Sequence, residues 1–182
     1  MSTTVQILLV SGSLRRRSTN LAVLRTVQAV ASEGVVASLF EGMGDLPHFN
    51  PDLDAEPLPP AVSDLRAQIR GVDALMFSTP EYAGALPGSF KNLLDWTIGD
   101  DHAGSIYEKP VAWINASPRG AANAHESLGK VLGYVHARVV TAACIHVPVA
   151  EAQIADDGSV AERHIREQIA AAVSELAEAV AY

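Results

Sequence analysis

The sequence contains a single cysteine, Cys144. One cysteine can form neither an intramolecular disulfide nor a cysteine-bound metal cluster. It lies in the apolar run 139–149, so we expect a small core residue rather than a nucleophile. The six histidines are scattered along the chain, which predicts surface or loop positions rather than metal ligands. We therefore expect no metal site.

Long hydrophobic runs are also missing. No stretch of about 18 apolar residues occurs, so the sequence predicts no membrane-spanning segment. Residues 1–4 lack the basic segment that precedes the apolar part of a secretory signal. We therefore expect a cytoplasmic protein. The formal net charge of −8 argues against nucleic acid or an anionic membrane as the main partner.

Length and composition are those of one globular domain. The chain has 182 residues, enough for one substantial core. Hydrophobic residues make up 48% and charged residues 19%, a balance that argues against disorder. We find no internal repeat, low-complexity tract or linker. The sequence therefore predicts a single domain over residues 1–182.

Strand-like and helix-like patterns alternate along the chain. Short apolar, β-branched runs predict strands, whereas apolar residues at helical spacing predict helices. A stretch rich in Pro, Asp and Gly, residues 42–60, predicts a long surface loop, and its final prolines predict the start of a short helix. The other expected elements are strands at 5–10, 35–40, 73–78, 111–115 and 139–149, and helices at 20–33, 87–98, 121–137 and 160–179.

Five strands joined by helices predict parallel pairing with right-handed crossovers, and helices on both faces of the sheet. The expected fold class is α/β, a three-layer α/β/α sandwich around a flavodoxin-like five-stranded parallel sheet of order 2-1-3-4-5. In that order, ligands bind where the strand order reverses, between the first and third strands. The loops after those two strands are the most distinctive of the chain.

The loop after the first strand is rich in hydroxyl groups and arginine. Residues 12–20 read Gly-Ser-Leu-Arg-Arg-Arg-Ser-Thr-Asn, and a helical pattern follows at once. A helix N-terminus is an anion site, to which Ser13, Arg15, Ser18 and Asn20 add side-chain donors. The stretch is neither the glycine fingerprint of dinucleotide folds nor a P-loop. It predicts a phosphate site; the alternative is an ordinary capped turn with solvated arginines.

The loop after the third strand is stiffened by proline and glycine. Pro80, Gly84 and Pro87 limit its freedom and let its backbone approach a flat ligand closely. Tyr82 offers an aromatic edge and a hydroxyl group. The alternative is a proline-punctuated turn into a helix, with Trp96 in the core.

Together these segments resemble a known family. Gly-Ser-Leu-Arg-x-x-Ser-x-Asn at 12–20 and Pro-Glu-Tyr-x-x-x-x-Pro-Gly-x-x-Lys-Asn-x-x-Asp-Trp at 80–96 are similar to motifs of the NAD(P)H-dependent FMN reductases. That family includes bacterial quinone and chromate reductases and related azoreductases. Leu46-Pro47 and Asn50-Pro51-Asp52-Leu53 extend the likeness, which covers roughly residues 5 to 150.

The resemblance implies noncovalent FMN, with NADPH or NADH as cosubstrate, in a homodimer or homotetramer. It implies that the first loop grips the FMN phosphate, and that the second loop and a third loop after the fourth strand line the ring. Tyr82 is the candidate on the substrate side, and no side chain is expected to be catalytic. The implied FMN-binding residues are Ser13, Leu14, Arg15, Ser18, Asn20, Pro80, Glu81, Tyr82, Ala83, Gly84, Ser117 and Arg119.

Two places depart from the family's pattern. Ala83 stands where the family usually has Asn or another polar residue, which predicts a change in substrate range more than in FMN affinity. Residues 118–121, Pro-Arg-Gly-Ala, replace a glycine-richer stretch and put the contacts of Arg119 in question.

The predicted activity is electron transfer from NAD(P)H through bound FMN to a small-molecule acceptor: a quinone, free flavin, azo compound or metal oxyanion. The flavin supplies the reactive atom, so the lack of His-Glu-x-x-His, Cys-x-x-Cys and Gly-x-Ser-x-Gly motifs fits this activity. The expected cycle is ping-pong, with coenzyme and acceptor using one place in turn. Arg15 and Arg119 are candidates for the 2′-phosphate of NADPH, whereas Arg16 and Arg17 are expected to be solvated.

Two other functions fit parts of the pattern. A flavodoxin-type electron carrier would bind FMN without a pyridine-nucleotide site, but its phosphate loop is built from Thr and Ser without arginine. A flavin-free binding module of the same fold would not need the segments 12–20 and 80–82. The sequence favours the reductase over both.

Overall fold

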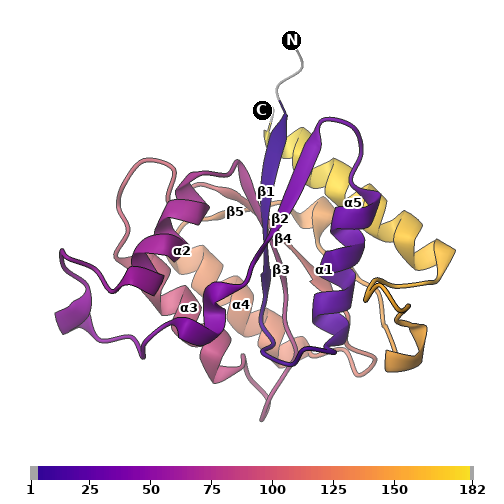
Figure 1. The fold of residues 1–182 in the computed structure, drawn as a ribbon, viewed down its shortest axis with the longest axis horizontal. Coiled ribbons are helices and arrows are strands. Elements are labelled where there is room, and N and C mark those ends of the chain that lie inside the picture. Colours follow the sequence, from indigo (N-terminus) through magenta and orange to yellow (C-terminus); the bar gives the residue numbers. More distant parts are fainter. Residues whose placement is uncertain (1–3, 181–182) are drawn as a thin grey trace.

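The computed structural model describes residues 4–180. Its centre is a parallel sheet in which β2, β1, β3, β4 and β5 follow one another, with β6 also paired to β4 (Figure 1). This order confirms the predicted flavodoxin-like α/β fold. The principal strands are β1 (Val5–Ser11), β2 (Val35–Phe40), β3 (Ala74–Ser78) and β4 (Pro110–Asn115).

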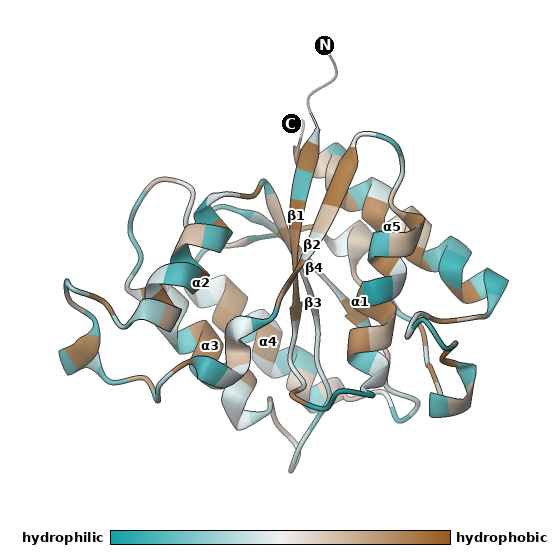
Figure 2. Ribbon diagram, viewed as in Figure 1, coloured by the Kyte–Doolittle hydropathy of each residue, from teal (hydrophilic) through white to brown (hydrophobic). Residues whose placement is uncertain are grey.

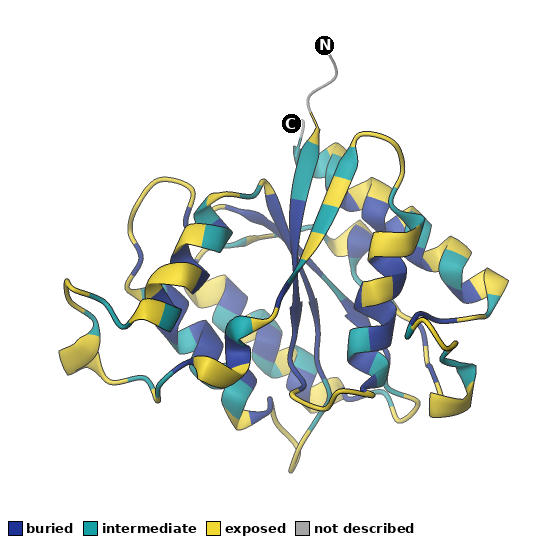
Figure 3. Cartoon of the chain, in the orientation of Figure 1, coloured by how far each residue is buried: buried dark blue, intermediate teal, exposed yellow. Residues whose placement is uncertain are grey.

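Helices cover both faces of the sheet. The strands β1, β3 and β4 are consequently apolar almost throughout, whereas β2 at the edge alternates in burial (Figures 2 and 3). Within residues 4–180, no helix is both long and apolar enough to cross a membrane. One face carries α1 (Thr19–Val30) and α5 (Arg163–Val180), and the other carries α2 (Pro60–Arg70), α3 (Gly88–Ile98) and α4 (Ala122–Tyr134).

The prediction of one strand over 139–149 was wrong. The segment forms two short strands, β5 (Arg138–Val139) and β6 (Ile145–His146), separated by the 3₁₀ turn Thr141–Ala143. Both pair with β4, but β4 advances three residues from Val111 to Ile114 while the edge advances six, from Val139 to Ile145. The turn absorbs the excess and buries Ala143 in the cluster under α5. A continuous apolar run cannot reveal such a break.

Smaller differences concern element ends. The loop at 42–60 contains two 3₁₀ turns, Gly42–Asp45 and Pro51–Leu53. α1 ends at Val30 rather than at residue 33. α5 begins at Arg163 rather than at residue 160, because Val160 pairs with Ile154 in an isolated bridge instead.

The carboxyl ends of the parallel strands lie at one edge of the sheet (the lower edge in Figure 1). The strand order reverses between β1 and β3, so the loops after these strands diverge to opposite faces. A crevice forms between them, and the loop after β4 lies next to it. This is where the site must be sought.

Candidate functional site

The loops after β1 and β3 are in close contact at Gly12. Its N–H donates to the carbonyl of Ser78 at 2.8 Å. A Cβ at position 12 would lie 2.6 Å from Cβ of Thr79 and 2.9 Å from the ring of Phe90. Neither neighbour can move freely, because both are buried. Glycine is therefore required for the two loops to approach each other.

The hydroxyl groups of the first loop hold its own backbone. The N–H of Ser13 donates to Ser11 Oγ at 3.2 Å, and the N–H of Arg15 donates to Ser13 Oγ at 3.3 Å. Ser11 and Ser13 are buried, whereas the side chains of Leu14 and Arg15 are exposed. In Figure 2 this hydrophilic loop follows the apolar strand directly.

The first turn of α1 carries two buried polar residues. Ser18 is the N-cap, and its Oγ accepts the N–H of Asn20 at 3.2 Å. The Ser78 hydroxyl lies 3.0 Å from Asn20 Oδ1 and 2.7 Å from the carbonyl of Ile114. The Asn20 side chain is thereby fixed across β3, and its NH₂ group has no hydrogen-bond partner within residues 4–180.

The loop after β3 contains an anchor and a turn. Glu81 is the anchor: its Oε2 accepts the N–H of Ala124 at 3.0 Å, in the first turn of α4. Tyr82 and Ala85 then exchange two backbone hydrogen bonds of 3.1 Å around a two-residue turn. The turn projects into solvent, and the Tyr82 side chain is 50% exposed.

The loop after β4 is held from two sides. Asn115 Nδ2 donates to the carbonyl of Gly120, and Asn115 Oδ1 accepts the N–H of Ser117 at 3.0 Å. From the sheet edge, His146 Nε2 donates to the carbonyl of Ser117 at 2.8 Å. Arg119 donates its N–H to Ser117 Oγ at 3.2 Å, and its side chain is exposed.

These three loops enclose a cavity of about 360 Å³. Six of the residues assigned to FMN from the sequence line it, together with Thr19, Pro118 and Ala121, which lie in the predicted loops but were not assigned to the site. Tyr82, Ala83 and Gly84 lie outside it on the exposed turn. The six lining residues are Arg15, Asn20, Pro80, Glu81, Ser117 and Arg119.

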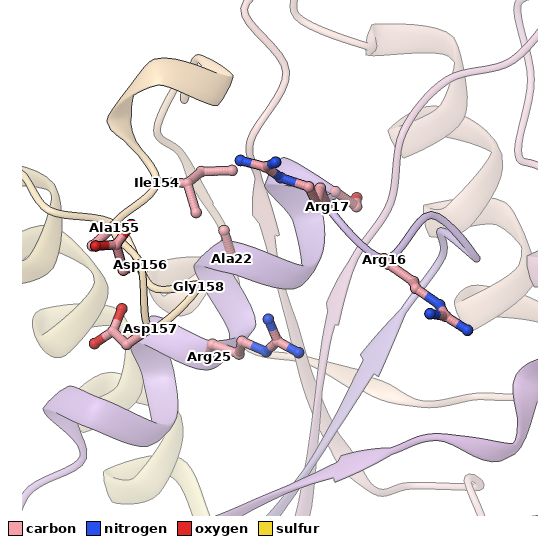
Figure 4. Close-up of a pocket in the computed structure, with 10 residues that line it drawn as sticks. Arg16, Arg17, Ala22, Arg25, Ile154, Ala155, Asp156, Asp157 and Gly158 are labelled. Atoms are coloured by element: carbon pink, nitrogen blue, oxygen red, sulfur yellow. The ribbon is translucent and has the colours of Figure 1, made fainter.

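Two further cavities lie beside the first loop. One, of about 460 Å³, contains Ser13 and Leu14 and opens toward the end of β2. The other, of about 220 Å³, lies between Ser18 and the turn at 154–158 (Figure 4). Three arginines, Arg16, Arg17 and Arg25, and two carboxylates, Asp156 and Asp157, line this smaller cavity.

Arg15 has a partner that the sequence did not suggest. Its Nη2 lies 2.7 Å from Oε1 of Glu151, and both side chains are exposed. The hydrogen bond and charge of Glu151 raise the pKa of Arg15 further above its ordinary value. Because exposed ion pairs contribute little stability, Arg15 remains available to another anion.

His125 is a half-buried titratable group beside the site. Its Nδ1 lies 2.8 Å from the carbonyl of Ala121, so Nδ1 must carry the proton. Nε2 is buried and has no partner among the described residues. Burial lowers the pKa of His125, which keeps the ring neutral.

A parallel sheet of this order, with three loops closing around an anion-type helix N-terminus, defines a flavodoxin-like protein. Residues 5–152 match the family of NADPH-dependent FMN reductases, and the chain belongs to that family. It is therefore an oxidoreductase of the type that uses FMN and NAD(P)H.

Individual relatives support this membership. An NAD(P)H-dependent FMN reductase of Pseudomonas aeruginosa is 36% identical over 137 residues, 74% of this chain and 73% of the relative. A quinone reductase of Pseudomonas putida is 36% identical over 65% of this chain, and the match spans 63% of that relative. Among solved structures, the flavoenzyme NAD(P)H:(acceptor) oxidoreductase FerB from Paracoccus denitrificans has a TM-score of 0.77 and 30% identity, and covers 97% of both chains.

Proposed function

We propose that the protein transfers electrons from NAD(P)H, through FMN bound between the three loops, to a small acceptor such as a quinone, free flavin, azo compound or metal oxyanion. The observation that carries this proposal is the cavity of about 360 Å³ at the switch point of the sheet. It combines an arginine and a helix N-terminus at one side with a proline-stiffened loop at the other. This donor set fits a phosphorylated, flat ligand.

The first loop would hold the phosphate of FMN. Ser13, Ser18 and Asn20 are buried and already fixed, so they would present their polar groups without rearrangement. Arg15 would add the positive charge, and Leu14 would flank it. Asn20 lines the cavity, and its side chain, held against Ser78, would bond a phosphate oxygen there.

The second and third loops would hold the ring. Pro80, Glu81 and Gly84 would contact it mainly through backbone atoms, with Glu81 fixed by its bond to α4. Ser117 and Arg119 would close the other side. Tyr82 and Ala83, at the exposed turn, would face the acceptor.

FMN, when bound, supplies hydride acceptance from the nicotinamide and electron donation to the acceptor. The chain would bind and orient both reactants at one place in turn, which is a ping-pong cycle. Arg15 and Arg119 lie on the same cavity, and either can meet a phosphate of the coenzyme. The arginines and the family membership favour this enzyme over a carrier without a coenzyme site.

We also propose a homodimer or homotetramer of a single-domain chain, in the cytoplasm. An apolar contact surface is available on α3 and α4, where the exposed Tyr134 stands beside Ile98 and Val131 around a cavity of about 310 Å³. The location and the domain count remain predictions from the sequence.

The direct test is an anaerobic absorbance spectrum of the FMN-incubated, desalted protein, before and after addition of NADPH and then NADH. A bound-flavin band that bleaches rapidly supports the proposal. A bound flavin that neither coenzyme reduces would favour an electron carrier, and no bound flavin would refute the proposal.

A matched pair of arginine variants tests the phosphate site. We expect Arg15→Gln to weaken FMN binding about 10-fold, because a charged hydrogen-bond partner is lost. Arg163→Gln removes another exposed, ion-paired arginine, on α5, and should leave the dissociation constant unchanged. The measurement is fluorescence quenching of FMN, and equal losses in both variants would exclude Arg15 from the site.

A further inference from the structure

The cavity of about 460 Å³ lies on the opposite side of the first loop from the proposed flavin site. It is bounded by the carboxyl end of β2, the turn Gly42–Asp45 and the first half of α1. The proposed FMN site shares Ser13, Leu14 and Arg15 with this cavity but leaves its walls at β2 and α1 free. Its walls differ in chemistry, since one is apolar and the other carries arginine.

The apolar wall suits a flat ring. Phe40 and Met43 form a buried floor, and Leu21 and Leu39 are partly exposed at the sides. Leu14 is 60% exposed and lines the same cavity. It extends to the turn at 42–45 and partly covers the cavity, since its Cδ2 would lie 3.5 Å from a Cβ at residue 44. Together these side chains offer an apolar wall against which a ring can pack.

The opposite wall suits a phosphate group. Arg16 and Arg25 line it, and neither forms an ion pair within residues 4–180. Both also line the smaller cavity, where Arg25 Nη1 lies against Gly158. Figure 4 shows the Arg16 side chain pointing away from the turn at 154–158, whereas Arg17 extends toward Ile154. Arg16 lines both cavities, whereas Arg17 lines only the smaller one. Two unpaired guanidinium groups at one wall form a natural phosphate site.

Arg15 connects the two sides of the loop, because it lines both this cavity and the proposed flavin site. A ligand with a flat ring at each end and phosphates between them can extend from the flavin site to this cavity along Arg15. A dinucleotide has this form. Glu41, directly after β2, also lines this cavity, and the arginines must outweigh its negative charge where a phosphate binds.

We propose that this cavity binds the adenosine 2′-phosphate end of NADPH, with the adenine against the apolar wall and the 2′-phosphate on Arg16 and Arg25. The inference rests on the proposed function, since the nicotinamide end must reach the flavin. Binding of the 2′-phosphate by Arg16 and Arg25 would make the protein selective for NADPH over NADH.

Calorimetric titration of the FMN-loaded protein with adenosine 2′,5′-bisphosphate and with 5′-AMP tests the site. The experiment is run at about 0.15 M salt to screen nonspecific attraction. We expect the bisphosphate to bind about 10-fold more tightly than 5′-AMP, and Arg16→Gln or Arg25→Gln to remove most of that difference. Arg17→Gln, adjacent in sequence but directed elsewhere, is the matched control and should retain it.

Equal binding of the two nucleotides by the parent protein would overturn the inference, as would an equal loss in the Arg17→Gln variant. The same preparations report the proposed function separately through FMN retention and bleaching by coenzyme. If FMN is bound and reduced while Arg16→Gln and Arg25→Gln still prefer the bisphosphate, only the assignment of this cavity fails. If no FMN is retained, the proposed function fails first.

Discussion

Ala83 has a backbone conformation that alanine rarely adopts. Its φ is 51° and that of Gly84 is 73°, so both central residues of the hairpin turn are left-handed. Asparagine tolerates this region better, because its side chain bonds locally. We expect Ala83→Asn to raise the free energy of unfolding by about 1 kcal/mol, measured by urea denaturation. Ala85→Asn, without a left-handed φ, should change it by less than about 0.5 kcal/mol. Equal effects would mean that polarity, not backbone conformation, is responsible.

His125 should make stability depend on pH. Burial lowers its pKa in the folded protein below the ordinary value of 6.5. Between these two pKa values the unfolded chain binds a proton that the folded protein does not, so the free energy of unfolding falls as the pH drops below 6.5. Denaturation between about pH 7.5 and 5.5 should show a smaller fall for His125→Gln than for the parent. The exposed His164→Gln should match the parent; a match by His125→Gln as well would contradict the assignment.

At the scale of elements, a buried ion pair joins the loop at 42–60 to the helices. Arg66 on α2 donates from Nη2 to Asp54 at 2.7 Å and from Nε to the carbonyl of Trp96 on α3 at 2.9 Å. Arg66 is only 5% exposed, so removal of its partner leaves an uncompensated charge. We expect Asp54→Ala to lower the free energy of unfolding by about 3 kcal/mol in urea denaturation. Glu167→Ala breaks an exposed pair with Arg163 and should have no measurable effect; similar losses in both would refute the buried role.

The helices, strands and loops also show how much of the fold and of the candidate site the sequence predicts. Strands β1, β3 and β4 and the helices were recognisable, because burial on one or both sides leaves a periodic or continuous apolar pattern. The break between β5 and β6 could not be recognised, because it depends on the register of these strands against β4. The loops that form the candidate site were identified from their residues, but one of their contacts was not. The pairing of Arg15 with Glu151 joins positions 136 apart in the chain, and no local pattern indicates it.

At the scale of the whole molecule, charge is unevenly distributed around the sheet. The protein carries a net charge of −8, yet Arg15, Arg16, Arg17, Arg25 and Arg119 all belong to the loops or first helix at the carboxyl edge of the sheet. The same edge also carries five carboxylates, those of Glu41, Glu81, Glu151, Asp156 and Asp157. Binding of anionic FMN and NADPH at this edge would therefore depend on the local placement of the arginines, while the acidic remainder of the molecule disfavours their binding elsewhere.

The edge strand of a sheet has unpaired backbone N–H and C=O groups that can pair with a strand of another molecule. Beside β4, however, that edge consists of two strands of only two residues each, Arg138–Val139 and Ile145–His146, with a turn between them. A foreign strand finds no continuous run there with which to pair, so this side of the molecule is protected against edge-to-edge aggregation. The opposite edge, the six-residue strand β2, has no such interruption. If the folded protein templates the growth of aggregates, growth will begin along β2.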